Sequence, residues 1–260
     1  MTVSQGSLQA IVMAAGKGSR MTDLTSTKAK CLLPLAGHPL VWHPLNMLQT
    51  NGFTEAIVIV PDSAKSEVLK IPEKYNLGMK LDVVSVSGQE DIGTADSLRL
   101  VADRLTGGDV VIVSGDLVME DSLRGLLDLH RMKSAAMTAL LARTAADMRG
   151  VAVPGDKKSN KYKAERDLVG LHGDHLCLFT AEADVEEEEV KIGGKMMRSV
   201  GSFTVHTNLI DAHLYVMKKW ICDYIISDRY HYYYYCCSFL FQTIFLETCQ
   251  QSRESSCPSL

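Results

Sequence analysis

The stretch that decides the fold is residues 11–40, IVMAAGKGSRMTDLTSTKAKCLLPLAGHPL. Its apolar run gives way to Gly16 and Gly18, and Arg20 and Lys30 follow. Small residues after a strand let backbone N–H groups approach a phosphate or a base, and an arginine can pair with phosphate oxygens. The glycines match neither GxGxxG nor GxxxxGK[ST], so a purely structural turn between strand and helix is the alternative.

Apolar segments rich in Val and Ile recur outward from this loop and are typical of strands buried on both faces. They occupy residues 8–14, 55–60, 81–86, 109–116 and 136–143. Amphipathic stretches that predict crossover helices lie between them, at residues 38–51, 63–75, 94–105 and 121–133. This alternation predicts an α/β fold with a doubly wound, mostly parallel, Rossmann-like sheet.

The composition describes an ordinary globular protein. The 260 residues are 46% hydrophobic and 22% charged with a net charge of −4, which gives no overall attraction to nucleic acid or to anionic membranes. We expect no secretory signal, because the amino terminus has no basic region and its apolar stretch runs into glycines, and no membrane span, because no run of eighteen apolar residues occurs. The seven cysteines form no CxxC pair, so we expect a reduced protein of the cytosol.

The pattern loosens after residue 143. Residues 167–179 predict two antiparallel strands turning at Gly173, and 202–206 predict a further strand before the apolar stretch 209–226. From residue 227 the sequence fits neither periodicity, and five of the nine tyrosines lie between Tyr230 and Tyr235. We therefore expect one domain over residues 1–226 and an aberrant, disordered tail over residues 227–260.

A carboxylate at the end of a strand adds chemistry to the loop. Asp116 follows the apolar strand 110–113, at the carboxyl end where α/β sheets bind ligands. Such a carboxylate can hold Mg²⁺ that bridges triphosphate oxygens, while cations offset the charge developing on the phosphates. The glycine loop, Lys30 and Asp116 together form the pattern expected for nucleotidyl transfer.

Four motifs resemble the sugar-phosphate nucleotidyltransferases: AAGKGSRM, KAKCLLPLAGHPL, GTADSLR and VSGDL. The resemblance implies that Gly16, Gly18 and Arg20 form the triphosphate loop, that Lys30 contacts phosphate, and that Asp116 binds magnesium. Mg²⁺ with a nucleoside triphosphate or a nucleotide sugar would then be the ligands.

The chain departs from that family at three positions. Ala29 and Cys31 flank Lys30 where family enzymes usually have prolines, and Asp96 takes a position that is usually small. The second metal-binding aspartate of active enzymes belongs in the region that the tail replaces. These departures argue against full metal-dependent chemistry in this chain.

Longer segments resemble the gamma subunits of translation initiation factor 2B. They are SRMTDLTS, PGDKKSNK followed by RDLVG, FTAEADVEEEEVKI and HTNLIDAHLYVMKKWICDYI. The resemblance covers roughly residues 8–226. It implies a regulatory subunit of a guanine-nucleotide exchange complex, with the other subunits, above all epsilon, and initiation factor 2 as partners. It implies neither direct nucleic-acid binding nor exchange catalysis by this chain.

In that family a left-handed β-helix of hexapeptide repeats follows, and no such repeat occurs in this sequence. The tail is therefore interpreted as the mark of a truncated isoform or a faulty gene model. Two further readings stay open: an active sugar-phosphate nucleotidyltransferase, and a non-functional fragment. We favour an inherited scaffold over a regulatory nucleotide site for the loop.

Overall fold

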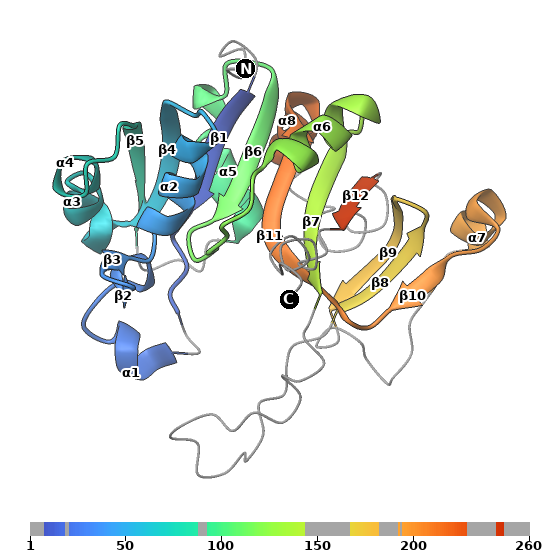
Figure 1. Cartoon of the computed structure of the whole chain (residues 1–260), viewed down its shortest axis with the longest axis horizontal. Coiled ribbons are helices and arrows are strands. Elements are labelled where there is room, and N and C mark those ends of the chain that lie inside the picture. Colours follow the sequence, from blue (N-terminus) through green and yellow to red (C-terminus); the bar gives the residue numbers. More distant parts are fainter. Residues whose placement is uncertain are drawn as a thin grey trace, which may run out of the picture. The chain divides into compact units, whose positions relative to one another are not determined.

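The computed structural model describes residues 8–18, 21–87, 93–143, 167–181, 192, 194–227 and 243–246. The chain forms two compact units, shown in Figure 1. The first combines residues 1–137 with 213–233, and the second combines residues 138–212 with 234–260. The first unit is therefore discontinuous in sequence. All of the described residues of the predicted site belong to it.

The first unit is built on a mostly parallel sheet, as the sequence predicts. Its strands are β1 (Leu8–Met13), β4 (Glu55–Pro61), β5 (Lys80–Val86), β6 (Asp109–Ser114) and β11 (Leu209–Lys218, from His213 onward). They lie in the order β11-β6-β1-β4-β5, and only β11 runs antiparallel to its neighbour β6. Ile11 of β1 stands between Ile57 and Ile112 and is fully buried, which explains the continuous Val and Ile runs.

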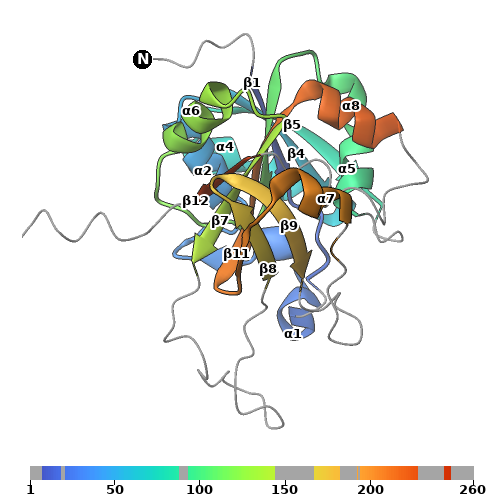
Figure 2. The same ribbon diagram turned by 90° about the vertical axis from the view of Figure 1, so that its right-hand side faces the viewer.

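Helices cover both faces of this sheet. They are α2 (Trp42–Thr50), α3 (Lys65–Val68), α4 (Ile71–Lys74), α5 (Thr94–Leu100), α6 (Arg124–Met132) and α8 (Lys219–Ser227), with α1 (Thr22–Thr25) beside the glycine loop. Short 3₁₀ turns are η2 (Lys30–Leu32), η3 (Asp62–Ala64) and η4 (Ala102–Arg104). Figure 2 shows α2 and α5 on opposite faces of the sheet. Leu45 and Leu48 of α2 and Ile221 of α8 are completely buried, so these two helices contribute to the core.

Two predicted helices differ from the structure. The helix expected from His38 begins only at Trp42, because residues 34–39 form a hairpin of β2 (Pro34–Leu35) and β3 (His38–Pro39). The turn of this hairpin has positive φ at Ala36 (49°) and Gly37 (84°). The helix expected over residues 63–75 is divided into η3, α3 and α4, and a proline stands in the first turn of α4.

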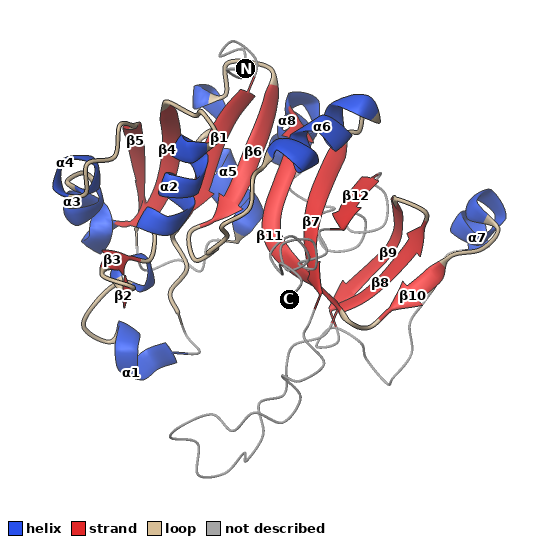
Figure 3. Ribbon diagram, viewed as in Figure 1, coloured by secondary structure: helices blue, strands red, loops and turns tan. Residues whose placement is uncertain are grey.

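The second unit is largely antiparallel. It contains β7 (Met137–Arg143, from Thr138 onward), β8 (Asp167–His172), β9 (His175–Ala181), β10 (Thr204–His206) and α7 (Gly194–Val200). Strands β10, β8 and β9 form a three-stranded sheet, coloured as strands in Figure 3. Gly173 has φ 61° in the β8–β9 turn, where the sequence predicts it. Leu141, Val169, Leu171, Leu176 and Leu209 form a buried cluster.

One strand lies in the segment expected to stand outside the fold. Thr243–Leu246 forms β12, which pairs in parallel with Thr138–Leu141 of β7. The prediction of an irregular tail is therefore wrong for these four residues, whose sequence TIFL combines the β-branched, aromatic and apolar residues that favour strands. Ser227, the first residue of the predicted tail, is the last residue of α8, and residues 228–242 and 247–260 lie outside the described residues.

No helix in the described part of the chain has both the length and the apolar character that a membrane crossing requires.

Candidate functional site

The glycine loop leaves β1 at the carboxyl end of the sheet. Ala14 N donates to Ile59 O and Gly115 N donates to Met13 O, both at 2.8 Å, so the neighbouring strands β4 and β6 hold the start of the loop. Gly115 also permits this close approach, because a Cβ there would lie 2.6 Å from Ala14 Cβ. The loop therefore begins at a rigid point.

The two glycine positions of the loop differ in whether the fold requires a glycine there. Gly18 has φ +67°, and a Cβ there would lie 2.7 Å from Thr25 Cγ2, so any other residue would be strained at this turn. A Cβ on Gly16 would meet no atom within 4 Å. The protein itself does not need a glycine at this position, whereas a ligand that approaches the backbone would. Arg20, the loop cation predicted from the sequence, lies outside the described residues.

The structure brings Lys30 and Asp116 together across 86 residues of sequence. Lys30 opens η2 and its Nζ forms an ion pair with Asp116 Oδ2, while Ser114 Oγ donates to Oδ1 of the same carboxylate. Burial opposes ionisation of Asp116, but the hydrogen bonds from Lys30 and Ser114 and the lysine charge outweigh it, so the pKa of this carboxyl is lowered. Asp116 is therefore a stable anion beside a cation.

A cavity of about 460 Å³ opens on the loop side of Lys30. Its lining residues are Gly16, the basic Lys17, Lys28 and Lys30, the hydroxyl-bearing Thr25, Ser26, Thr27, Ser63 and Ser87, the acidic Glu67, and the apolar Ala15, Ala29, Leu32, Pro61 and Val86. Lys30 is already paired with Asp116, which leaves Lys17 and Lys28 against Glu67 in the lining. This excess of positive charge favours an anionic ligand, and hydroxyls can donate to its oxygens. The arrangement suits a phosphate chain.

Magnesium would find a limited set of ligands here. Within the described ranges, no group of three or more His, Cys, Asp or Glu residues could hold a metal ion. Mg²⁺ is commonly held by one or two carboxylates together with water and substrate phosphates, so Asp116 alone fits an ion held mainly by phosphate oxygens. To coordinate it, Asp116 would have to exchange or share its contact with Lys30.

The residues that flank Lys30 depart from the family pattern, but the backbone at Ala29 is compatible with the proline that the pattern has there. Ala29 has φ −59° and ψ 141°, values that a proline would also adopt. Cys31 is buried, and burial raises the pKa of its thiol to about 11, so it acts as a small apolar side chain. Val41 N donates to Cys31 O at 3.0 Å and fixes η2.

The charge of Asp96 is compensated within its own helix. Arg99 forms an ion pair with Asp96, and Arg99 Nη2 donates at 3.0 Å to the carbonyl of Ile225 near the end of α8. The negative charge at this usually small position is therefore offset by an adjacent cation. Sequence reasoning missed Arg99 and Ser114, although the three-residue spacing of Asp96 and Arg99 on a helix is a signal for such a pair.

Comparison with known proteins places this geometry in a family. The family model for nucleotidyl transferases matches residues 9–160, which is more than half of the chain. In the search of solved structures, a Bacillus anthracis protein named as a glucose-1-phosphate thymidylyltransferase, in complex with sucrose, matches with a TM-score of 0.61 and 15% identity. That match covers 84% of this chain and 74% of that one, and it shows the fold alone.

Curated relatives carry two kinds of name. Translation initiation factor eIF2B subunit gamma of Dictyostelium discoideum is 26% identical over 87% of this chain and 54% of its own length. Mannose-1-phosphate guanylyltransferase of Mycobacterium tuberculosis is 29% identical over 58% of this chain and 42% of its own length. The chain thus spans about half the length of the curated relatives it matches. The resemblance to gamma subunits is confirmed, and the chain belongs to the nucleotidyl transferase family.

Proposed function

We propose that this chain is a regulatory, gamma-type subunit of the eIF2B guanine-nucleotide exchange complex, which promotes GDP/GTP exchange on initiation factor 2. The observation that carries the proposal is the similarity to eIF2B gamma over 87% of the chain, beyond the residues 9–160 that the family model matches. The epsilon subunit and initiation factor 2 are the proposed partners, and the cytosol is the proposed compartment.

The site supports a role as a scaffold rather than as a catalyst. Lys30 and Asp116, the two residues expected to act on phosphate and metal, are paired with each other. Among the described residues, no group of three or more His, Cys, Asp or Glu side chains could hold a metal ion. A protein that works through contacts can keep such a cavity as an inherited part of the fold. Within this proposal, the alternative to an inherited scaffold is that the cavity binds a regulatory nucleotide.

The test is assembly followed by exchange. The tagged chain is expressed in eukaryotic cells, isolated at physiological salt, and its companions are identified by mass spectrometry. We expect the epsilon subunit and its companions to be recovered, and we expect GDP release from initiation factor 2 to change when this chain is added to the complex. Recovery of soluble chain alone would contradict the proposal.

An active sugar-phosphate nucleotidyltransferase is the second candidate function. The convergence of the glycine loop, Lys30 and Asp116 at one end of the sheet favours it. In that case Lys30 would position the triphosphate and Asp116 would hold Mg²⁺. Pyrophosphate exchange with nucleoside-diphosphate sugars and Mg²⁺ is the assay.

The second candidate requires that Lys30→Ala reduces pyrophosphate exchange by at least about 100-fold, the usual effect of removing one stabilising charge from a reacting phosphate. Lys70→Ala, an exposed lysine that does not line the cavity, is the matched control and should keep full exchange. Absence of exchange in the unmodified chain excludes this function and leaves the subunit proposal intact. Non-cooperative unfolding of the purified chain would support the third reading, a non-functional fragment.

A further inference from the structure

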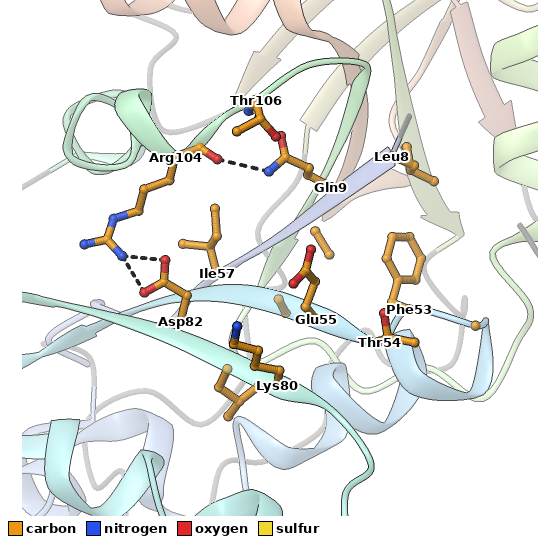
Figure 4. Close-up of a pocket in the computed structure, with 14 residues that line it drawn as sticks. Leu8, Gln9, Phe53, Thr54, Glu55, Ile57, Lys80, Asp82, Arg104 and Thr106 are labelled. Carbon is orange, nitrogen blue, oxygen red and sulfur yellow. Dashed lines mark hydrogen bonds and ion pairs between the residues drawn. The ribbon is translucent and has the colours of Figure 1, made fainter. Parts of the chain in front are cut away.

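A second cavity lies at the amino-terminal ends of the strands, away from the glycine loop. Its volume is about 620 Å³, and it shares no lining residue with the glycine-loop cavity. Figure 4 shows it between the starts of β1, β4 and β5 and the end of η4. Four of its lining residues carry a charge: Glu55, Lys80, Asp82 and Arg104.

The cavity exists because the neighbouring strands β1 and β4 are not paired at their first residues. β1 pairs with β6 from Leu8 onward, and β4 pairs with β5 from Glu55 onward. The ladder between β1 and β4, in contrast, begins only at Ile11 and Ile57. The first residues of β1 and β4 are therefore outside any ladder with each other, and the sheet is open between them at this end.

The opening presents backbone groups as well as side chains. Lys80 N donates at 2.9 Å to Thr54 O, so the carbonyl of Thr54 faces β5. Because backbone groups alternate in direction along a strand, those of Glu55 face the β1 side, where the ladder has not yet begun. A ligand in the opening can thus meet a backbone donor and acceptor of β4.

One wall of the cavity is fixed by a polar network. Arg104 Nη1 donates to both carboxylate oxygens of Asp82, as the dashed lines in Figure 4 show. Gln9 Nε2 donates to Arg104 O at 3.0 Å, and Thr106 N donates to Gln9 Oε1 at 2.9 Å. The side chain of Gln9 therefore ties the end of η4 to β1.

Two charges in the cavity lack such partners. Glu55 and Lys80 are register partners in adjacent parallel strands, so their side chains project from the same face of the sheet. Among the residues that the structure describes, neither forms an ion pair, although each lines the same space. A carboxylate and an ammonium group, both on exposed residues of neighbouring strands, are thus available to a ligand in a cavity whose other two charges are already paired.

We propose that this cavity binds a small zwitterion with the chemistry of a free α-amino acid. The ligand ammonium would pair with Glu55 and the ligand carboxylate with Lys80. The four charged side chains of the cavity cancel, so an isolated anion or cation meets as much repulsion as attraction, whereas a neutral dipolar molecule satisfies both available charges. Ile57, two residues after Glu55 on the same face of β4, provides apolar contact for an uncharged side chain.

The test uses the whole 260-residue chain and a panel of free α-amino acids, with binding measured by ligand-observed NMR and calorimetry. We expect at least one amino acid to bind. Its N-acetyl derivative, which lacks the ammonium group, and its amide, which lacks the carboxylate, should each bind at least about tenfold more weakly, as expected for loss of a charged hydrogen bond.

Two variants and two matched controls locate the site. Glu55→Gln and Lys80→Gln should each weaken binding by at least about tenfold. Glu73→Gln and Lys70→Gln change exposed residues outside the cavity and should leave binding unchanged. Thermal unfolding of all four variants checks that they remain folded, and the derivatives test the unmodified chain without any substitution.

Three outcomes would overturn the proposal. They are no binding of any amino acid up to about 10 mM, equal binding of the derivatives, and unchanged binding by both cavity variants. The proposal does not depend on the subunit role, so recovery or loss of eIF2B partners leaves it unaffected.

Discussion

The two glycines of the loop that follows β1 can be separated by substitution. Gly18→Ala places a Cβ 2.7 Å from Thr25 Cγ2 in a backbone with φ +67°, so we expect the free energy of unfolding to fall by about 1–3 kcal/mol. Gly16→Ala meets no atom within 4 Å and should change stability by less than about 0.5 kcal/mol. Urea denaturation monitored by circular dichroism measures both. Equal losses would show that the loop geometry described for Gly18 is incorrect.

His130 gives stability a dependence on pH. Its side chain is 2% exposed, with Nε2 3.7 Å from Asp109 Oδ2. Burial lowers the pKa of His130, the Asp109 carboxylate opposes this, and Lys218 and Arg131 lower it further. The pKa of His130 in the folded chain lies below the ordinary 6.5, so the unfolded chain takes up the proton first as the pH falls. The stability that neutral, buried His130 contributes is therefore complete above pH 6.5 and is lost as the pH falls through the lowered folded pKa.

The measurement compares the chain with His130→Leu. Between pH 6.5 and the lowered folded pKa, the free energy of unfolding of the unmodified chain should fall by up to about 1.4 kcal/mol per pH unit more than that of the variant, the limit for one proton. Identical slopes in urea titrations across this range would contradict the role of His130.

At the scale of elements, Arg99 joins two helices that are far apart in sequence. Its guanidinium bonds Asp96 on α5 and, on α8, the carbonyls of Ile225 at 3.0 Å and Ile226 at 3.5 Å. Carbonyls at a helix end have no intrahelical partner, and a cation there also suits the helix dipole. Arg99 therefore completes the carboxyl end of α8.

Arg99→Ala should lower the free energy of unfolding by about 1–3 kcal/mol, because the buried carbonyls lose a charged donor. Arg124→Ala, at the exposed start of α6, is the matched control and should stay within about 0.5 kcal/mol. Denaturant titration measures the free energy of unfolding of both variants. Equal free energies for the two variants would contradict a stabilising link between α5 and α8 through Arg99.

The elements differ in how far the sequence could predict them. The five strands 8–14, 55–60, 81–86, 109–116 and 136–143 were predictable from runs rich in apolar residues. Four of them are mostly buried, whereas β5 at the edge of the sheet is only partly buried. The hairpin at residues 34–39 was not predictable, since Ala36 adopts positive φ without the usual turn residue. β12 was missed because its four residues are too few to show a period, and only the partner β7 defines them as a strand.

The sequence could predict which residues form the candidate site better than how those residues contact one another. The order of loop, lysine and aspartate along an α/β chain places all three at one end of the sheet, where the structure has Lys30 and Asp116. Their direct pairing could not be read from the sequence, because it depends on η2 turning Lys30 toward β6. The cavity around Glu55 and Lys80 was also not predictable, because it results from the register at which β1 and β4 begin to pair.

At the scale of the whole molecule, buried thiols report on each unit separately. Cys31 and Cys222 lie in the first unit and Cys177 in the second, and all three are free and buried. Burial raises the pKa of Cys177 and raises the pKa of Cys31 and of Cys222 to about 11. Since the thiolate is the reactive form, native chains should react slowly at these positions.

We expect Cys31 and Cys222 to become reactive to iodoacetamide at the same urea concentration, because they belong to one cooperative unit. Peptide mass spectrometry after brief labelling gives the midpoint for each thiol, and Cys177 gives that of the second unit. Different midpoints for Cys31 and Cys222, or rapid labelling without urea, would show that the first unit does not unfold as described.

The discontinuity of the first unit has a consequence during synthesis. Residues Leu214–Lys218 of β11 pair with Val113–Asp109 of β6, and residues 138–212 must leave the ribosome before they arrive. Until then, one edge of β6 lacks its antiparallel neighbour, and an uncovered strand edge invites pairing with other chains. A translational pause within residues 138–212 would therefore lengthen the period in which the nascent chain depends on chaperones.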